Sequence, residues 1–236
     1  MLVGWAWRLY LANWRPVLAV SAILAVVEWL FFLATIGTLP AHPTRTQLVS
    51  VGVPFDLAGP LLVLIGVWAA ATLLNFFGGA AEEGVAASGD MWACARASLS
   101  RAWPLLLTML AATLAGAVGL ALLVVPGVYL LTRWSVAPVL AAAEGQRAGA
   151  ALRRSYELTA GHFWHALGTV LLVAVAIVAG TLALSEVGTA VLVAAGLRSP
   201  AGILLWQELV SAAGNPWLLA TLVALRDDLV LRARVG

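Results

Sequence analysis

The sequence predicts an all-α, polytopic membrane protein with six transmembrane helices, paired as three hairpins, and with amphipathic helices at the membrane interface. Three observations support this prediction. First, 63% of the 236 residues are hydrophobic and only 10% are charged, whereas about 25% are charged in an ordinary soluble domain. Second, the mean hydropathy is +1.00. Third, the apolar residues form long continuous runs, unlike the alternating pattern of barrel strands.

The first half of the chain contains three runs close to the length of about 20 apolar residues that a helix needs to cross the hydrocarbon core. The first expected span, Val17–Leu39, is interrupted only by Glu28. The second, Leu57–Phe77, has Asn75 near its end, and the third, Pro104–Val125, contains no charge.

The fourth expected span, Val128–Ala143, contains Arg133 and is separated from the third only by Pro126 and Gly127. Read as one helix, residues 104–143 would be about 60 Å long, roughly twice the hydrocarbon thickness. Pro-Gly is a strong turn signal, so we expect a tight hairpin here. Pro138 is expected to kink the fourth span because proline lacks a backbone N–H.

Two further spans are expected in the last third of the chain. His165–Leu184 is uninterrupted, and Ile203–Leu225 contains Glu208 and the residues Gly214, Asn215 and Pro216. Pro216 can bend this last span.

The segments between the spans form an approximate repeat, with units of about 1–83, 84–144 and 145–236 within one membrane domain. In each unit a polar or amphipathic segment and a tryptophan precede a span; the three tryptophans are Trp14, Trp103 and Trp164. Residues 84–102 and 145–163 mix arginines with apolar residues and are predicted to be interfacial helices. Of the two longer outer loops, 40–56 is polar and contains proline, and the apolar part of 185–200 is expected to lie across the outer surface.

The arginines predict the orientation. The sequence contains no lysine, and ten arginines fall on the side that holds the N-terminus and the even-numbered loops: Arg8, Arg15, Arg96, Arg101, Arg147, Arg153, Arg154, Arg226, Arg232 and Arg234. The other side holds only Arg45 and Arg198. Positive residues concentrate on the cytoplasmic side, so both termini are expected there. Basic residues that are all arginine suggest a bacterial genome, and hence a bacterial inner-membrane protein.

Glu28 and Arg133 are the two charges placed deepest in the first and fourth spans. Counted along the helices, both lie about 15–17 Å above the cytoplasmic boundary. Charges inside a membrane usually pair or line a cavity, so a Glu28–Arg133 ion pair is predicted. The alternative is that the Arg133 side chain extends toward the outer surface, since side chains tilt toward the helix N-terminus.

Arg147, Arg153 and Arg154 are candidates for contact with lipid headgroups, because basic residues near the membrane bind anionic lipid phosphates. Trp14, Trp103 and Trp164 are expected at the same depth. Membrane lipids are therefore the expected partners, with a second membrane protein or another copy of the chain as further possibilities.

Catalysis is not expected from this sequence. A single Cys94 excludes an intrachain disulfide, and His162 and His165 have no obvious third metal ligand nearby. No nucleotide, hydrolase or zinc-protease motif occurs, so we expect no enzyme activity, metal or cofactor. A net charge of +2 gives no field for binding nucleic acid.

The central run 126–167 resembles the membrane domain found with some glycerophosphoryl diester phosphodiesterases and its stand-alone relatives. The matching residues are Pro126, Gly127, Tyr129, Arg133, Pro138, Glu144, Ala151–Ser155, Leu158, Gly161 and Trp164. The opening Asn13-Trp14 and the run 225–234 also fit. The resemblance implies a six-span membrane protein of poorly defined role. It does not imply phosphodiesterase activity, which belongs to a separate barrel of about 250 residues.

The sequence therefore favours a non-catalytic membrane module that associates with lipids or anchors a partner. The first alternative is a small transporter or a permease component that uses the Glu28–Arg133 region as a polar pathway. The second alternative is a membrane-embedded enzyme that acts on phospholipid headgroups through the acidic helix ends.

Overall fold

The computed structural model describes residues 2–35, 45–83, 90–122, 124–197 and 199–235, and no strand occurs in these ranges. The predicted all-helical membrane fold is confirmed, because six segments are long and apolar enough to cross a membrane. The helices are α1 (Leu2–Ala12), α2 (Trp14–Thr35), α3 (Arg45–Glu83), α4 (Met91–Leu122), α5 (Val124–Arg133), α6 (Ala137–Ala142), α7 (Ala148–Leu158), α8 (Phe163–Ala194) and α9 (Pro200–Val235).

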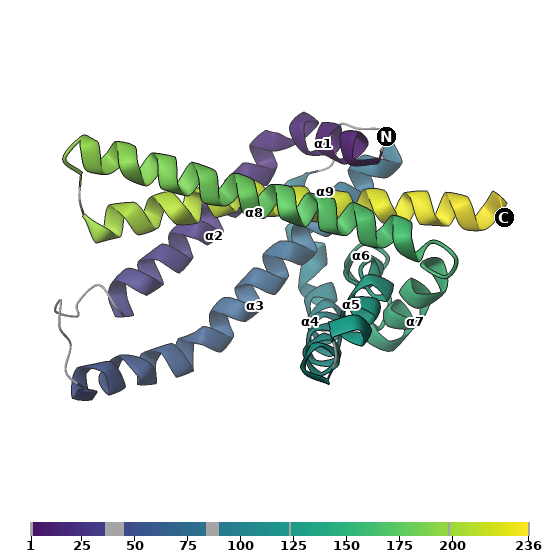
Figure 1. Ribbon diagram of the computed structural model, residues 1–236, viewed down its shortest axis with the longest axis horizontal. Coiled ribbons are helices and arrows are strands. Elements are labelled where there is room, and N and C mark those ends of the chain that lie inside the picture. Colours follow the sequence, from purple (N-terminus) through teal and green to yellow (C-terminus); the bar gives the residue numbers. More distant parts are fainter. Residues whose placement is uncertain (1, 36–44, 84–89, 123, 198, 236) are drawn as a thin grey trace.

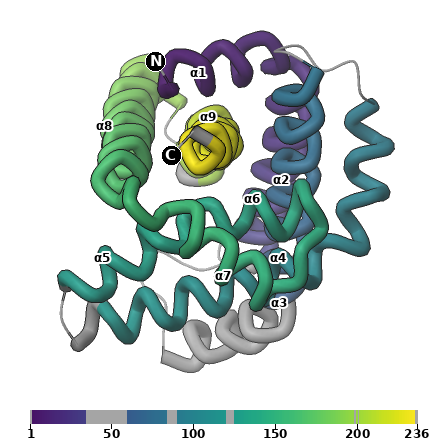
Figure 2. Tube along the Cα trace, turned by 90° about the vertical axis from the view of Figure 1, so that its right-hand side faces the viewer, coloured from purple at the N-terminus to yellow at the C-terminus, as the bar shows by residue number. Residues whose placement is uncertain are grey.

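Helix α9 occupies the centre of the molecule. Figure 2 shows it end-on, with α8, α1 and α2 around it and α5, α6 and α7 below. Most of its buried side chains are small or branched apolar residues, among them Ala220, Val223, Leu225 and Leu229. These residues pack with apolar side chains from the surrounding helices into one core. In contrast, α8 is mostly exposed along its length, and its apolar surface suits contact with lipid.

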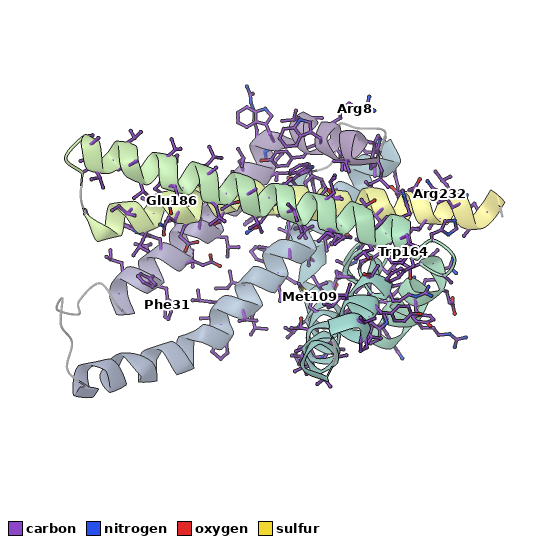
Figure 3. All side chains as sticks on the ribbon, viewed as in Figure 1. Arg8, Phe31, Met109, Trp164, Glu186 and Arg232 are labelled. Carbon is purple, nitrogen blue, oxygen red and sulfur yellow. The ribbon has the colours of Figure 1, made fainter. Side chains whose placement is uncertain are left out.

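The α8–α9 hairpin defines two ends of the molecule. The two helices lie side by side and antiparallel, and the start of α1 and the end of α9 lie at the same end (Figure 1). We call this the termini end. Arg8, Trp164 and Arg232 lie toward it, whereas Phe31 and Glu186 lie toward the opposite end (Figure 3). The α4–α5 hairpin has a different direction: where α8 and α9 are seen end-on, α4 and α5 run across the view (Figure 2).

Short helices precede the spans in the first and third repeat units but not in the second. α7 ends before Gly161, whose φ of 80° is a left-handed conformation that favours glycine. The chain then turns into α8. The predicted separate helix over 84–102 is wrong for its described part, since residues 91–102 form the start of α4. No glycine lies between residues 91 and 103 to end a helix. Residues 84–89 lie outside the described residues.

The two segments predicted to be outer loops are also more helical than expected. α8 continues to Ala194, so the apolar part of 185–200 extends the helix and does not lie across the outer surface. This helix ends in a Schellman motif, where the Leu197 N–H donates to the Leu192 carbonyl and Gly196 has a φ of 81°. The predicted loop 40–56 is likewise wrong from Arg45 onward, where α3 begins. Residues 36–44 lie outside the described residues.

The hairpin between the third and fourth spans is confirmed, but Pro126 and Gly127 do not form its turn. They lie in the first turn of α5, where a proline is tolerated because the N–H groups there have no partner within the helix. Gly119 lets α4 and α5 approach closely, because a Cβ there would come within 2.8 Å of the Gly127 Cα.

Candidate functional site

The fourth span is interrupted immediately after Arg133. Pro138 cannot donate a backbone hydrogen bond, and α5 and α6 are separated by residues 134–136. The Arg133 carbonyl is left without its ordinary helical partner, because the Ala137 N–H donates to Trp134. Hydroxyl groups of α7 replace that partner: Ser155 Oγ donates to the Arg133 carbonyl at 2.8 Å and Thr159 Oγ1 donates to it at 3.2 Å. The helix break is therefore held by α7.

The Arg133 guanidinium lies between two aromatic rings. Its central carbon is 5.1 Å from the ring centroid of Tyr129 and 4.6 Å from that of Tyr156. Cation–π contacts of this kind stabilise a charge with little water around it. The two tyrosine hydroxyls lie 3.3 Å apart, and this hydrogen bond raises the pKa of Tyr156 above its ordinary value. Aromatic rings thus accommodate a cation that the sequence placed in an apolar run.

The structure does not join Glu28 to Arg133, and no ion pair between them occurs among the described residues. The predicted ion pair assumes that the first and fourth spans are parallel, so that Glu28 and Arg133 lie at the same depth in the membrane. The α4–α5 hairpin instead runs across the direction of α8 and α9 (Figure 2). Equal distances along two crossing helices do not bring side chains together. The rings of Tyr129 and Tyr156 take the place of the predicted carboxylate.

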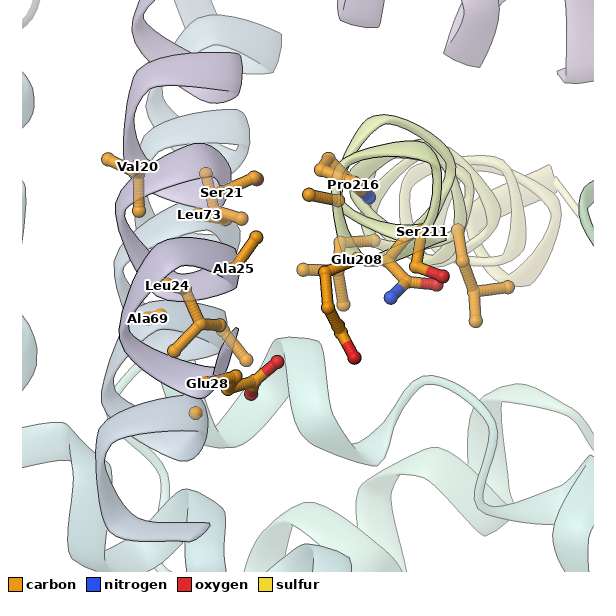
Figure 4. A pocket seen from close by; sticks show the side chains of 16 residues that line it. Val20, Ser21, Leu24, Ala25, Glu28, Ala69, Leu73, Glu208, Ser211 and Pro216 are labelled. Atoms are coloured by element: carbon orange, nitrogen blue, oxygen red, sulfur yellow. The ribbon is translucent and has the colours of Figure 1, made fainter. Parts of the chain in front are cut away.

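Glu28 instead lines a cavity of about 270 Å³ between α2, α3 and α9. The same cavity is lined by Glu208, so two carboxylates from helices far apart in sequence share it. Their side chains face the same space between α2 and α9 (Figure 4). No arginine among the described residues lies within ion-pair distance of either carboxylate. We call this space the acidic cavity.

Each remaining polar side chain of the acidic cavity has an oxygen that can accept a hydrogen bond. Ser21, Ser211 and Asn215 lie in its lining, and the other lining residues are apolar or glycine. Pro216 also lines the cavity, and since it lacks an N–H it cannot donate to the carbonyl of Ala212, one turn earlier. Carboxylate, hydroxyl, amide and carbonyl oxygens in an apolar surrounding form a site that favours a cation.

Glu208 interrupts the sixth expected span, but its position near Glu28 is not predicted in the sequence analysis. The signal is the distance of each glutamate from the end of its helix that lies opposite the termini end. Glu28 lies seven residues before the end of α2 at Thr35, and Glu208 lies eight residues after the start of α9 at Pro200. Seven and eight residues correspond to about 11 and 12 Å along a helix. Comparing these two distances requires the exact ends of α2 and α9, and the apolar runs in the sequence do not define those ends.

At the termini end the carboxylates of α9 are paired with cationic side chains. Arg226 Nη1 lies 2.8 Å from Glu144 Oε1, and Arg226 Nε lies 2.7 Å from Asp227 Oδ1. Asp228 Oδ2 lies 2.8 Å from His165 Nε2 and 2.7 Å from Arg232 Nε. These contacts connect α9 to α8 and to the segment that follows α6. They give Glu144, Asp227 and Asp228, three of the acidic residues at helix ends, contacts that stabilise the fold.

A second, partly buried arginine connects α3 and α4 to the end of α6. Arg101 Nη1 donates to the Ala142 and Ala143 carbonyls at 3.1 and 3.0 Å, and it also donates to Asn75 Oδ1. The amide of Asn75 donates in turn to Ser98 at 3.1 Å. Asn75, which the sequence showed only as a polar residue near a span end, is therefore part of a hydrogen-bond network that caps the end of α6.

The predicted headgroup residues are all exposed. The exposed fraction is 46% for Trp14, 63% for Trp103 and 79% for Trp164. Arg147, Arg153 and Arg154 are also exposed, and Arg153 and Arg154 form ion pairs with Glu157 on the same helix. The structure leaves these side chains accessible, and contact with lipid stays a prediction.

Metal ligands do not gather in the described part of the chain, where no group of three or more His, Cys, Asp or Glu residues could hold an ion. The acidic cavity with its two carboxylates is therefore the strongest candidate site. Comparison with known proteins found no family model, no curated protein and no solved structure that matches the chain. The resemblance to the phosphodiesterase membrane domain stays a prediction that rests on its residues.

Proposed function

We propose that the protein is a small membrane transporter, or the permease component of a membrane complex, that binds a cationic group in the acidic cavity. The observation that carries this proposal is the presence of Glu28 and Glu208 on one cavity between candidate membrane spans, with no arginine of the described residues paired to either. Ionisable residues within membrane spans are costly and mark substrate or ion pathways.

The side chains that line the cavity indicate the charge of the solute. Two carboxylates close together in a medium of low dielectric repel each other strongly. A bound cation, or a proton shared between them, removes that repulsion. The apolar side chains that surround the carboxylates, such as Leu24 and Leu73, suit the carbon atoms of an organic ammonium ion. An organic ammonium, exchanged against protons, therefore fits the site better than an anion.

Binding to the purified protein in lipid nanodiscs tests the proposal, with tetraethylammonium, ammonium and sodium as probes in calorimetry. We expect at least one of these cations to bind, and Glu28→Gln or Glu208→Gln to weaken it about tenfold, the value of one charge-assisted contact. Proteoliposomes loaded with the same cation should release it through the wild-type protein and not through either variant.

Glu186→Gln is the matched control, because Glu186 is a glutamate in the apolar helix α8 that does not line the cavity. It should leave cation binding unchanged. If none of the three cations binds, or if Glu186→Gln weakens binding as much as the cavity variants do, the proposal is wrong.

A lipid-associating role is the second candidate, and the exposure of Trp164 and Arg153 favours it. These residues lie near the start of α8 and on α7, where an amphipathic helix with exposed arginines can contact lipid headgroups. The two roles are compatible, since a transporter also needs a defined position in the membrane.

A further inference from the structure

A second hollow lies between α1 and the last third of α9, at the termini end. It has a volume of about 850 Å³ and includes apolar surface from Leu2, Trp5 and Leu231. It is separate from the acidic cavity, because the two share no lining residue. We call it the α1–α9 groove.

The groove carries charges of both signs. Arg8 lies on the α1 side, and Asp227 and Asp228 lie on the α9 side. Arg8 is exposed and has no ion-pair partner among the described residues. An arginine guanidinium is well suited to bind a phosphate through two parallel hydrogen bonds.

The two aspartates retain oxygens for a ligand. Arg226 contacts Oδ1 of Asp227, and His165 and Arg232 both contact Oδ2 of Asp228. Each carboxylate therefore keeps one oxygen that none of these contacts uses. Such oxygens accept hydrogen bonds from an ammonium group, which has N–H donors, but not from a quaternary choline, which has none.

We propose that the α1–α9 groove binds the headgroup of a zwitterionic phospholipid with a primary amine, phosphatidylethanolamine. Its phosphate contacts Arg8, its ammonium contacts Asp227 and Asp228, and its acyl chains follow the apolar surface beside Trp5 and Leu231. The groove lies where α9 changes from apolar to charged sequence, after Leu225, which is the depth of a headgroup. Charge complementarity with both ends of one headgroup supports this occupant over an anionic lipid, whose phosphate would lie beside the two aspartates with no ammonium to offset them.

Native mass spectrometry of delipidated protein in detergent tests this, with equal amounts of phosphatidylethanolamine, phosphatidylcholine and phosphatidylglycerol added. We expect phosphatidylethanolamine to bind about tenfold more tightly than phosphatidylcholine, the value of a charge-assisted hydrogen bond. Arg8→Gln should weaken binding of both about tenfold, and Asp227→Asn should remove the preference for the primary amine.

Arg96→Gln is the control, because Arg96 is an exposed arginine on α4 outside the groove. It should change neither affinity nor preference. Asp227 also contacts Arg226, so the unfolding temperature of Asp227→Asn is measured alongside lipid binding. If this variant does not fold, the lipid preference of the wild-type protein decides whether the proposal holds. Equal binding of the three lipids, tightest binding of phosphatidylglycerol, or an Arg8→Gln variant that binds as the wild type does would overturn the proposal. None of these outcomes bears on cation binding in the acidic cavity.

Discussion

Helix α9 carries two charged regions that differ in how their charges are compensated. At the termini end, Arg226 lies between Glu144 and Asp227, and Asp228 lies between His165 and Arg232. Eighteen residues earlier on the same helix, Glu208 shares the acidic cavity with Glu28, and neither has an arginine partner among the described residues.

This difference in charge compensation distinguishes residues that stabilise the fold from residues that are available to bind a solute. A charge that already has its partner contributes to holding the helices together, and only the oxygens that such contacts leave unused can bind a ligand. A pair of like charges with no counter-charge costs stability and leaves a capacity for binding. We therefore assign the ion pairs to the fold, and the proposed transport function rests on the two carboxylates without an arginine partner.

The largest expected effect is on the paired side. Arg226 is 8% exposed, and Arg226→Gln leaves Glu144 and Asp227 without their cation. We expect a loss of about 2–3 kcal/mol in the free energy of unfolding, less than for a fully buried pair because both carboxylates remain partly in contact with water. Thermal unfolding in detergent measures this, with Arg232→Gln as the control, which should cost about 1 kcal/mol or less. Equal losses for the two variants would contradict the distinction between the buried and the exposed arginine.

A smaller effect is expected at Arg133, whose charge is compensated in a third way, by aromatic rings. Tyr156→Leu removes the closer ring, 4.6 Å from the guanidinium, and should cost about 1 kcal/mol. Tyr156→Phe keeps the ring and should retain most of that stability. The unfolding temperatures of the two variants test this, and a Phe variant as unstable as the Leu variant would show that the hydroxyl contact with Tyr129 matters more than the ring.

The smallest expected effect is a coupling close to zero between the acidic cavity and Arg133. Glu28→Gln and Arg133→Met, alone and combined, form a double-mutant cycle. Because Glu28 and Arg133 form no ion pair, their effects on the free energy of unfolding should add within about 0.5 kcal/mol. A larger coupling, measured by chemical unfolding in detergent, would restore the ion pair that the sequence predicted.

Long apolar runs made the number of spans predictable from the sequence, because each run must bury its backbone polar groups within one helix when no water is present. Gly161 likewise marks the point after which α7 has ended. Residues 91–102 contain no glycine, which explains why α4 is continuous. Both features depend on residues close together in the chain.

The partners of Glu28 and Arg133 could not be predicted in the same way. Their contacts depend on the angle between hairpins, and apolar composition does not determine how hairpins cross. The tyrosines around Arg133 were visible in the sequence, and Tyr129 lies one turn before it. Tyr156, however, reaches Arg133 only because α7 packs across the helix break, where Ser155 and Thr159 bind the freed carbonyl.

The central position of α9 has a consequence for biosynthesis. Of the described helices it is the last to leave the ribosome, yet its residues Ala220, Val223, Leu225 and Leu229 occupy the middle of the core. Until it is inserted, α1, α2 and α8 lack the main surface against which they pack and must wait in the bilayer with their inner faces against lipid. Assembly of the protein is thereby tied to completion of the chain, and a product terminated early lacks the element around which the others gather.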